Sequence, residues 1–167
     1  MYGKILPYEE AMQINSILFS TFIDSSSYEK QQEYNKSFYL EYGISLSTCL
    51  WNCLSIEPKR TSQYAAICYL ENVNQRLFVI EDAGKPTKGG LIERGSFYPV
   101  FVVPAKHRNE LFSFISSHDI TDIYVFDDSF DWLLIFTHEE IKAGRRYCLL
   151  VSHSKSTGSP GGSTVCK

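Results

Sequence analysis

The chain has 167 residues, 44% of them hydrophobic and 14% aromatic, which is ample for one domain of ordinary size with a substantial core. This composition excludes wholesale disorder. The formal net charge of −3 argues against broad binding to nucleic-acid phosphates, because such binding needs a basic face.

The cysteines and the N-terminus indicate a reducing compartment. Five cysteines are present, an odd number, and Cys49 and Cys53 stand in a C-x₃-C spacing with no second pair or nearby His. That spacing does not predict zinc, so we expect no metal and no cofactor. The first residues lack a signal-peptide pattern, and no apolar run approaches the ~18 residues of a membrane span. We therefore expect a cytoplasmic protein that does not bind membranes.

Two helices are predicted at the N-terminus. Pro7 followed by acidic residues indicates a helix start, and apolar residues then recur at helical spacing as far as Asp24. A second helix is expected from Ser27, as a cap, to Gly43, as a stop. Its aromatic residues form a stripe that we interpret as part of the core. They are Tyr28, Tyr34, Phe38, Tyr39 and Tyr42.

The middle of the chain alternates between apolar runs and polar segments. Residues 47–55 fit either a strand or a short helix, and residues 56–60 read as a loop. The run YAAICYL at 64–70 predicts a buried strand, with residues 76–81 as its antiparallel partner.

A glycine-rich loop and two further elements follow. The loop at 82–95 fails the phosphate-binding pattern, because Gly90-Leu91 stand where Lys and Ser/Thr are required. Residues 97–103 predict a strand, and Pro99 suggests that it lies at a sheet edge. Residues 104–117 carry apolar side chains at helical spacing.

The C-terminal part predicts a hairpin over residues 121–137 and a last strand at 146–152. Both runs of the hairpin are apolar on both faces, which is typical of central strands. We therefore expect an α+β fold, in which the N-terminal helices and one further helix pack on an antiparallel sheet of about five or six strands. Residues 1–152 would form a single globular domain, and the Ser/Gly-rich residues 153–167 a disordered tail.

The open end of the hairpin carries polar residues. If Asp128 and Ser129 are the two central residues of the turn, Asp127 pairs with Phe130. Counting outward then places His138 opposite Asp119, with His118 adjacent.

A His that faces an Asp has the geometry of a tuned base. Glu139 and Glu140 could add metal ligands. The alternative is a structural or interfacial His138, and a register slip of one residue would give it another partner.

The turn itself is acidic. Asp127, Asp128 and Asp131 form either a solvated tip or a negative patch that could meet a basic partner and speed its capture.

The same hairpin carries a resemblance. Tyr124-Val125-Phe126-Asp127, then Phe130, Trp132-Leu133-Leu134 and Thr137-His138-Glu139 resemble a C-terminal signature of small bacterial and phage proteins. Some of these proteins look like immunity proteins encoded beside toxins. The resemblance implies a small cytoplasmic α+β protein, and it brings no established catalytic residue to this chain.

We expect a non-catalytic protein-binding inhibitor, such as an immunity protein or a phage-encoded inhibitor that occludes its partner. The partner would be a protein, for example a basic toxin or defence protein. Its expected binding residues are Asp127, Asp128, Asp131, His138 and Glu139. The alternative is a small metal-dependent or His-dependent hydrolase that uses the 118–140 cluster, with His138, Asp119 and Glu139. A third possibility is a regulatory domain that binds a small ligand.

Overall fold

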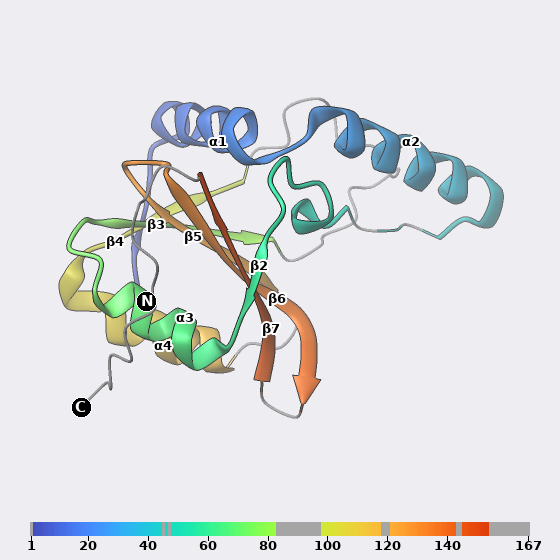
Figure 1. The fold of residues 1–167 in the computed structure, drawn as a ribbon. Coiled ribbons are helices and arrows are strands. Elements are labelled where there is room, and N and C mark those ends of the chain that lie inside the picture. Colours follow the sequence, from blue (N-terminus) through green and yellow to red (C-terminus); the bar gives the residue numbers. More distant parts are fainter. Residues whose placement is uncertain are drawn as a thin grey trace.

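An antiparallel sheet covered by helices forms the described part of the chain (Figure 1). The computed structural model describes residues 2–44, 46, 48–82, 98–117, 121–142 and 145–153. The glycine-rich segment 83–97 and the predicted tail beyond residue 153 lie outside these ranges.

Within these ranges the sheet has seven strands in the order β1-β4-β3-β5-β6-β7-β2. Their bounds are β1 Lys4–Ile5, β2 Lys59–Thr61, β3 Leu77–Asp82, β4 Val100–Val103, β5 Asp122–Asp127, β6 Trp132–Lys142 and β7 Arg145–Ser152. The helices are α1 Tyr8–Phe22, α2 Ser25–Tyr42, α3 Gln63–Glu71 and α4 Arg108–Ser117, with short 3₁₀ turns η1 Leu50–Asn52 and η2 Ala105–His107.

The predicted α+β class is confirmed, with seven strands rather than five or six. The sequence missed β1 and β2, the two edge strands. They have two and three residues, too short to carry an alternating pattern.

The side chains of the central strands point alternately to the two faces of the sheet. They pack into two separate hydrophobic cores, one on each face. On one face, Tyr124 and Phe126 of β5 pack with α1 and η1. On the other face, Ile123 and Val125 pack with α3 and α4. Figure 1 shows α1 on one side of the sheet and α3 and α4 on the other. Every residue of β5 is buried, as the prediction of central strands requires.

The two N-terminal helices form where they were predicted. α2, however, is capped by Asp24, three residues before the expected cap at Ser27, because the side chain of Asp24 accepts hydrogen bonds from the backbone N–H groups of Ser26 and Ser27. Gly43 ends the helix with φ 69°, a left-handed conformation that favours glycine.

The prediction of a strand at 64–70 is wrong, since these residues belong to α3. The Ser62 hydroxyl accepts from the N–H of Ala65, which caps the helix. Ala66 and Leu70, four residues apart, are the positions it buries. Periodicity cannot separate a helix from a strand in so short an apolar run. β3 pairs instead with β4 and β5.

The predicted 97–103 strand is β4, but it is not an edge strand. β1 pairs with its outer side, with Lys4 opposite Val102. Pro99 precedes the first residue of the strand, where its missing N–H costs no ladder hydrogen bond.

The hairpin of β5 and β6 is confirmed, but the predicted register is wrong by two residues. Tyr124 lies opposite Ile135, and Val125 lies opposite Leu134. The connection is wider than a two-residue turn, and within it Phe130 adopts a left-handed conformation, with φ 52°. A shift of two residues keeps every side chain on its predicted face.

None of the helices within the described ranges is both long and apolar enough to span a bilayer.

Trp132 lies in the core of the face that α3 covers. Its ring meets Tyr69 edge-on, with 5.1 Å between centroids, and its indole N–H donates to Asp127 at 3.0 Å.

Trp132→Ala should lower the free energy of unfolding by about 3–5 kcal/mol in urea titrations, because it leaves a large cavity. Tyr64→Ala, at an exposed α3 position, should change it by about 0.5 kcal/mol or less. A loss below about 1 kcal/mol for Trp132→Ala would contradict a core position.

Candidate functional site

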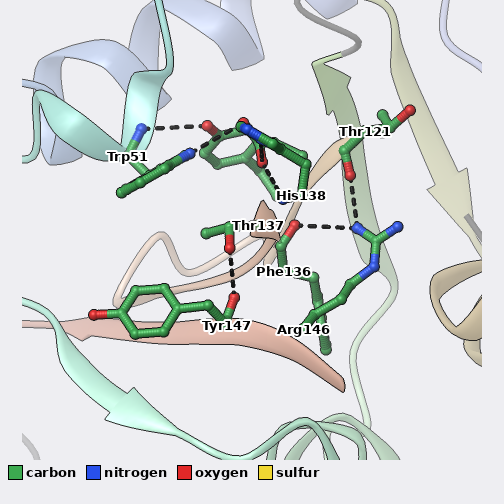
Figure 2. Close-up of polar contacts among 9 residues, drawn as sticks. Trp51, Thr121, Phe136, Thr137, His138, Arg146 and Tyr147 are labelled. Atoms are coloured by element: carbon green, nitrogen blue, oxygen red, sulfur yellow. Dashed lines mark hydrogen bonds and ion pairs between the residues drawn. The ribbon is translucent and has the colours of Figure 1, made fainter. Parts of the chain in front are cut away.

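The buried carboxylate of Asp122, at the start of β5, is the centre of a polar cluster on the α1 face of the sheet. Its Oδ1 accepts the backbone N–H of His138 at 2.6 Å and lies 2.9 Å from Nδ1 of the same residue. Its Oδ2 accepts the indole N–H of Trp51 at 3.0 Å. The Trp51 and His138 side chains lie close together in Figure 2. Asp122 is 2% exposed, so these donors replace the water that its charge has lost.

An irregularity in β6 brings His138 to this carboxylate. Phe136 pairs with Cys148 and Glu140 pairs with Arg146, so β6 advances by four residues while β7 advances by two. Such a bulge bends a strand and re-aims its side chains. The buried Thr137 hydroxyl donates to the Tyr147 carbonyl at 2.9 Å, which satisfies a polar group inside the distorted segment.

The guanidinium of Arg146 supports the same region. It is buried, and it donates to the Thr121 carbonyl at 2.6 Å and, at a longer 3.5 Å, to the Phe136 carbonyl (Figure 2). Arg146 therefore joins two segments. One is Thr121, directly before β5, and the other is the part of β6 at Phe136, where the bulge begins.

Cys49 completes the cluster from a third part of the chain, just before η1. Donor atoms of Cys49, Asp122 and His138 all lie within 4.8 Å of one another. Burial, followed by the charges of nearby carboxylates, raises the pKa of the Cys49 thiol to about 12. These carboxylates are Asp122, Asp82 and Glu139. The thiol is therefore protonated at neutral pH and is not an activated nucleophile.

The surroundings of the cluster are negative. Asp82 lies opposite Asp122 in the ladder between β3 and β5, and both are buried. Burial, together with the charges of these two carboxylates, raises the pKa of the fully buried Tyr124 hydroxyl. That hydroxyl accepts the backbone N–H of Trp51 at 3.2 Å, so η1 is attached to the sheet at two points.

The sequence placed His138 opposite Asp119, with His118 adjacent. The carboxylate partner of His138 is Asp122; Asp119 and His118 lie outside the described residues. Glu139 is exposed beside it, and of Glu140 only the backbone is described. Sequence reasoning missed Asp122, Trp51 and the contribution of Cys49. The available signal for Asp122 was a carboxylate directly before the apolar run Ile123–Phe126.

Of the three carboxylates in the predicted acidic tip, one is buried and two are exposed. Asp127 is buried, and its carboxylate accepts from Ser129 and from the Trp132 indole. Asp128 forms an ion pair with Arg76 at 2.8 Å. Asp131 is exposed. Asp127 therefore shapes the turn, and Arg76 offsets part of the charge that remains at the surface.

The aromatic stripe on the second helix was interpreted as core, and this interpretation is wrong for most of its length. Of its 18 described residues, α2 buries one, Asn35. The rings of Tyr34, Phe38 and Tyr42 contact one another in series, with centroid separations of 6.1 and 4.6 Å. We call these three residues the aromatic face of α2.

Tyr34 is 60% exposed and Tyr42 is 56% exposed. Other large apolar residues lie exposed nearby in the chain, namely Leu40, Ile44 and Leu46. Figure 1 shows α2 extending away from the sheet. Tyr28, in the first turn, does pack on the core through Phe19.

Comparison of the chain with protein-family models, with curated proteins and with solved structures finds no match.

The position of Asp127 leads to a prediction about stability rather than association. Asp127→Asn should lower the free energy of unfolding by about 1–3 kcal/mol, because a buried acceptor of three hydrogen bonds is impaired. Asp128→Asn is the matched control, and loss of its exposed ion pair should cost about 0–1 kcal/mol. Equal losses in denaturant titrations of the two variants would show that Asp127 does not anchor the turn.

Proposed function

We propose that the protein acts by binding another protein through the aromatic face of α2, in the manner of immunity proteins and phage-encoded inhibitors. The observation that carries this proposal is the exposure of Tyr34 and Tyr42 on a helix that buries one residue, Asn35, among its 18 described residues. Most helices in globular proteins owe their stability to packing of an apolar face. A helix whose aromatic face is left in water has the character of an interaction element.

Polar contacts hold the middle of α2 to the segment that follows it. The Asn35 side chain donates to the Thr48 hydroxyl at 2.9 Å, and the Gln32 side chain donates to the same hydroxyl at 2.7 Å. These bonds fix the helix against the segment that follows it, while Tyr34 and Tyr42 remain exposed. A pre-positioned helix loses little freedom when it binds, so more of the contact energy appears as affinity.

The composition of α2 indicates the kind of surface it would meet. Tyrosines are frequent anchors at protein interfaces, where the ring is buried and the hydroxyl finds a polar partner. An aromatic helix face suits an apolar groove. The helix and its cap carry four carboxylates, Asp24, Glu29, Glu33 and Glu41, against two lysines, Lys30 and Lys36, which gives a net charge of −2. We therefore expect a basic rim around the groove.

A second candidate function is a small His-dependent hydrolase. The observation that favours it is the 2.9 Å contact between His138 and the buried carboxylate of Asp122, because a carboxylate can orient an imidazole that acts as a general base. Within the described residues no activated nucleophile accompanies the pair, since the raised pKa of Cys49 keeps its thiol protonated.

The binding proposal is tested by site-specific photo-crosslinking in cells. A photoreactive phenylalanine analogue at position 42 should trap a partner protein, whereas the same analogue at Tyr64 on α3 should not. The affinity of the purified partner for the chain should then fall by more than about tenfold in Tyr34→Ser with Tyr42→Ser, because two interface anchors are lost. Tyr64→Ser, which removes a side chain of similar exposure, should leave the affinity unchanged.

Three outcomes would contradict the proposal. Crosslinks to a second copy of the chain alone would make α2 a dimerisation helix. A partner whose affinity is insensitive to Tyr34→Ser with Tyr42→Ser would place the interface elsewhere. Turnover that His138→Ala loses by about 10²–10⁴-fold, with the fold intact, would favour the hydrolase.

A further inference from the structure

We propose that Cys49, Asp122 and His138 bind one Zn²⁺ ion. This site lies apart from the aromatic face of α2 in the chain and is independent of the protein-binding function. The three residues come from separate segments: the approach to η1, the start of β5 and the bulge of β6. Their donor atoms nevertheless lie within 4.8 Å of one another.

The donor set selects zinc among the common divalent ions. Thiolate sulfur and imidazole nitrogen, joined by one carboxylate oxygen, are the ligands that Zn²⁺ takes in proteins. Mg²⁺ and Ca²⁺ prefer sites built entirely from oxygen, so a site with sulfur and nitrogen disfavours them.

The separation between His138 and Asp122 fits a tetrahedral ion after a small adjustment. Zinc bonds to nitrogen and oxygen are about 2.1 Å long, which places two such donors roughly 3.4 Å apart on one ion. The observed separation between His138 Nδ1 and Asp122 Oδ1 is 2.9 Å. The His138 side chain is 43% exposed, so its ring has room to turn by this amount or to present its other nitrogen.

The charge around the site favours a cation. Asp82 and Asp122 are buried opposite each other, and Glu139 is close enough to Cys49 to act on it electrostatically. Like charges gathered in a poorly solvated place are costly, and a divalent cation among them lowers that cost.

The hydrogen bonds that the Asp122 carboxylate accepts also suit a metal ligand. The indole N–H of Trp51 and the backbone N–H of His138 both donate to its carboxylate, which fixes its orientation. Outer contacts of this kind hold the ligands of protein metal sites in place.

On binding, the Cys49 thiol gives up its proton to solvent and the sulfur forms a bond to the ion. Three protein ligands leave a fourth position, which water or Glu139 could take. The ion would join the segment after α2 to β5 and β6.

The test uses the full chain, stripped of metal with a chelator and then titrated with Zn²⁺ against a chromophoric competitor. We expect saturation at one ion per chain. Titration with Co²⁺, which substitutes for zinc, should give the near-ultraviolet absorption of a thiolate-to-cobalt bond. Cys49→Ser should abolish that absorption, and His138→Gln should weaken zinc binding by more than about tenfold.

Matched controls exist for both variants. Cys68 is half-buried on α3, and His107 is 39% exposed beside α4, close to the exposure of His138. Cys68→Ser and His107→Gln should bind both metals as the unaltered chain does. The Tyr34→Ser with Tyr42→Ser variant should also keep its zinc, so failure of the binding proposal would not be mistaken for failure of this one.

Absence of saturable binding would overturn the site, as would a cobalt spectrum that survives Cys49→Ser. Equal weakening by the control variants would likewise show that the ion is held elsewhere. Asp122→Asn is left out of the test because its buried side chain holds η1 and β6 together, and far-ultraviolet circular dichroism should verify that the other variants remain folded.

Discussion

The buried carboxylate of Asp122 is the interaction on which the arrangement of this molecule depends. A charge that is 2% exposed is costly unless hydrogen bonds replace its water. Asp122 obtains them from the Trp51 indole and from the backbone of His138, which belong to segments far from each other in the chain. The same bonds therefore hold η1 against the sheet and fix the bulge of β6. Loss of this carboxylate would release both.

This attachment explains how α2 can project without packing its aromatic face. The segment between α1 and η1, which contains α2, projects from the core. Backbone hydrogen bonds hold its two ends together. The N–H of Asp24 donates to the Cys53 carbonyl at 2.7 Å, and the N–H of Ser55 donates to the Phe22 carbonyl at 2.9 Å. Trp51 then ties the returning segment to β5. Because the helix is held at its base, its aromatic face need not be buried for the fold to be stable.

Most of the fold could be predicted from local patterns. The first helices, the 104–117 helix and the hairpin all carry strong periodicity or clear start and stop residues, and each is confirmed. The failures have physical causes. α3 is a short apolar run in which a helix and a strand look alike, and the edge strands β1 and β2 are too short to show any pattern. The hairpin connection contains Phe130 with a left-handed backbone, a conformation that non-glycine residues adopt rarely and that local patterns did not indicate.

The candidate site was less predictable than the fold, because its members meet through tertiary structure. His138 stood out as a polar residue after an apolar strand, but a register shift and a bulge determined its partner. Cys49 lacked the spacing of a metal motif, and nothing local connects it to residues more than seventy positions away. The aromatic face of α2 was visible in the sequence, but helical spacing does not tell whether a stripe faces a core or a partner.

The most direct test of the central role of Asp122 is a double-mutant cycle with Trp51. Trp51→Phe removes the indole N–H, Asp122→Asn removes the charge, and the two are combined in a third variant. Free energies of unfolding from urea titrations give the coupling between them. If the carboxylate holds η1 to the sheet through Trp51, the coupling should be about 1–3 kcal/mol, as expected for contacting residues that share a buried hydrogen bond. Losses that simply add, with a coupling below about 0.5 kcal/mol, would show that the two residues act independently and would contradict the account.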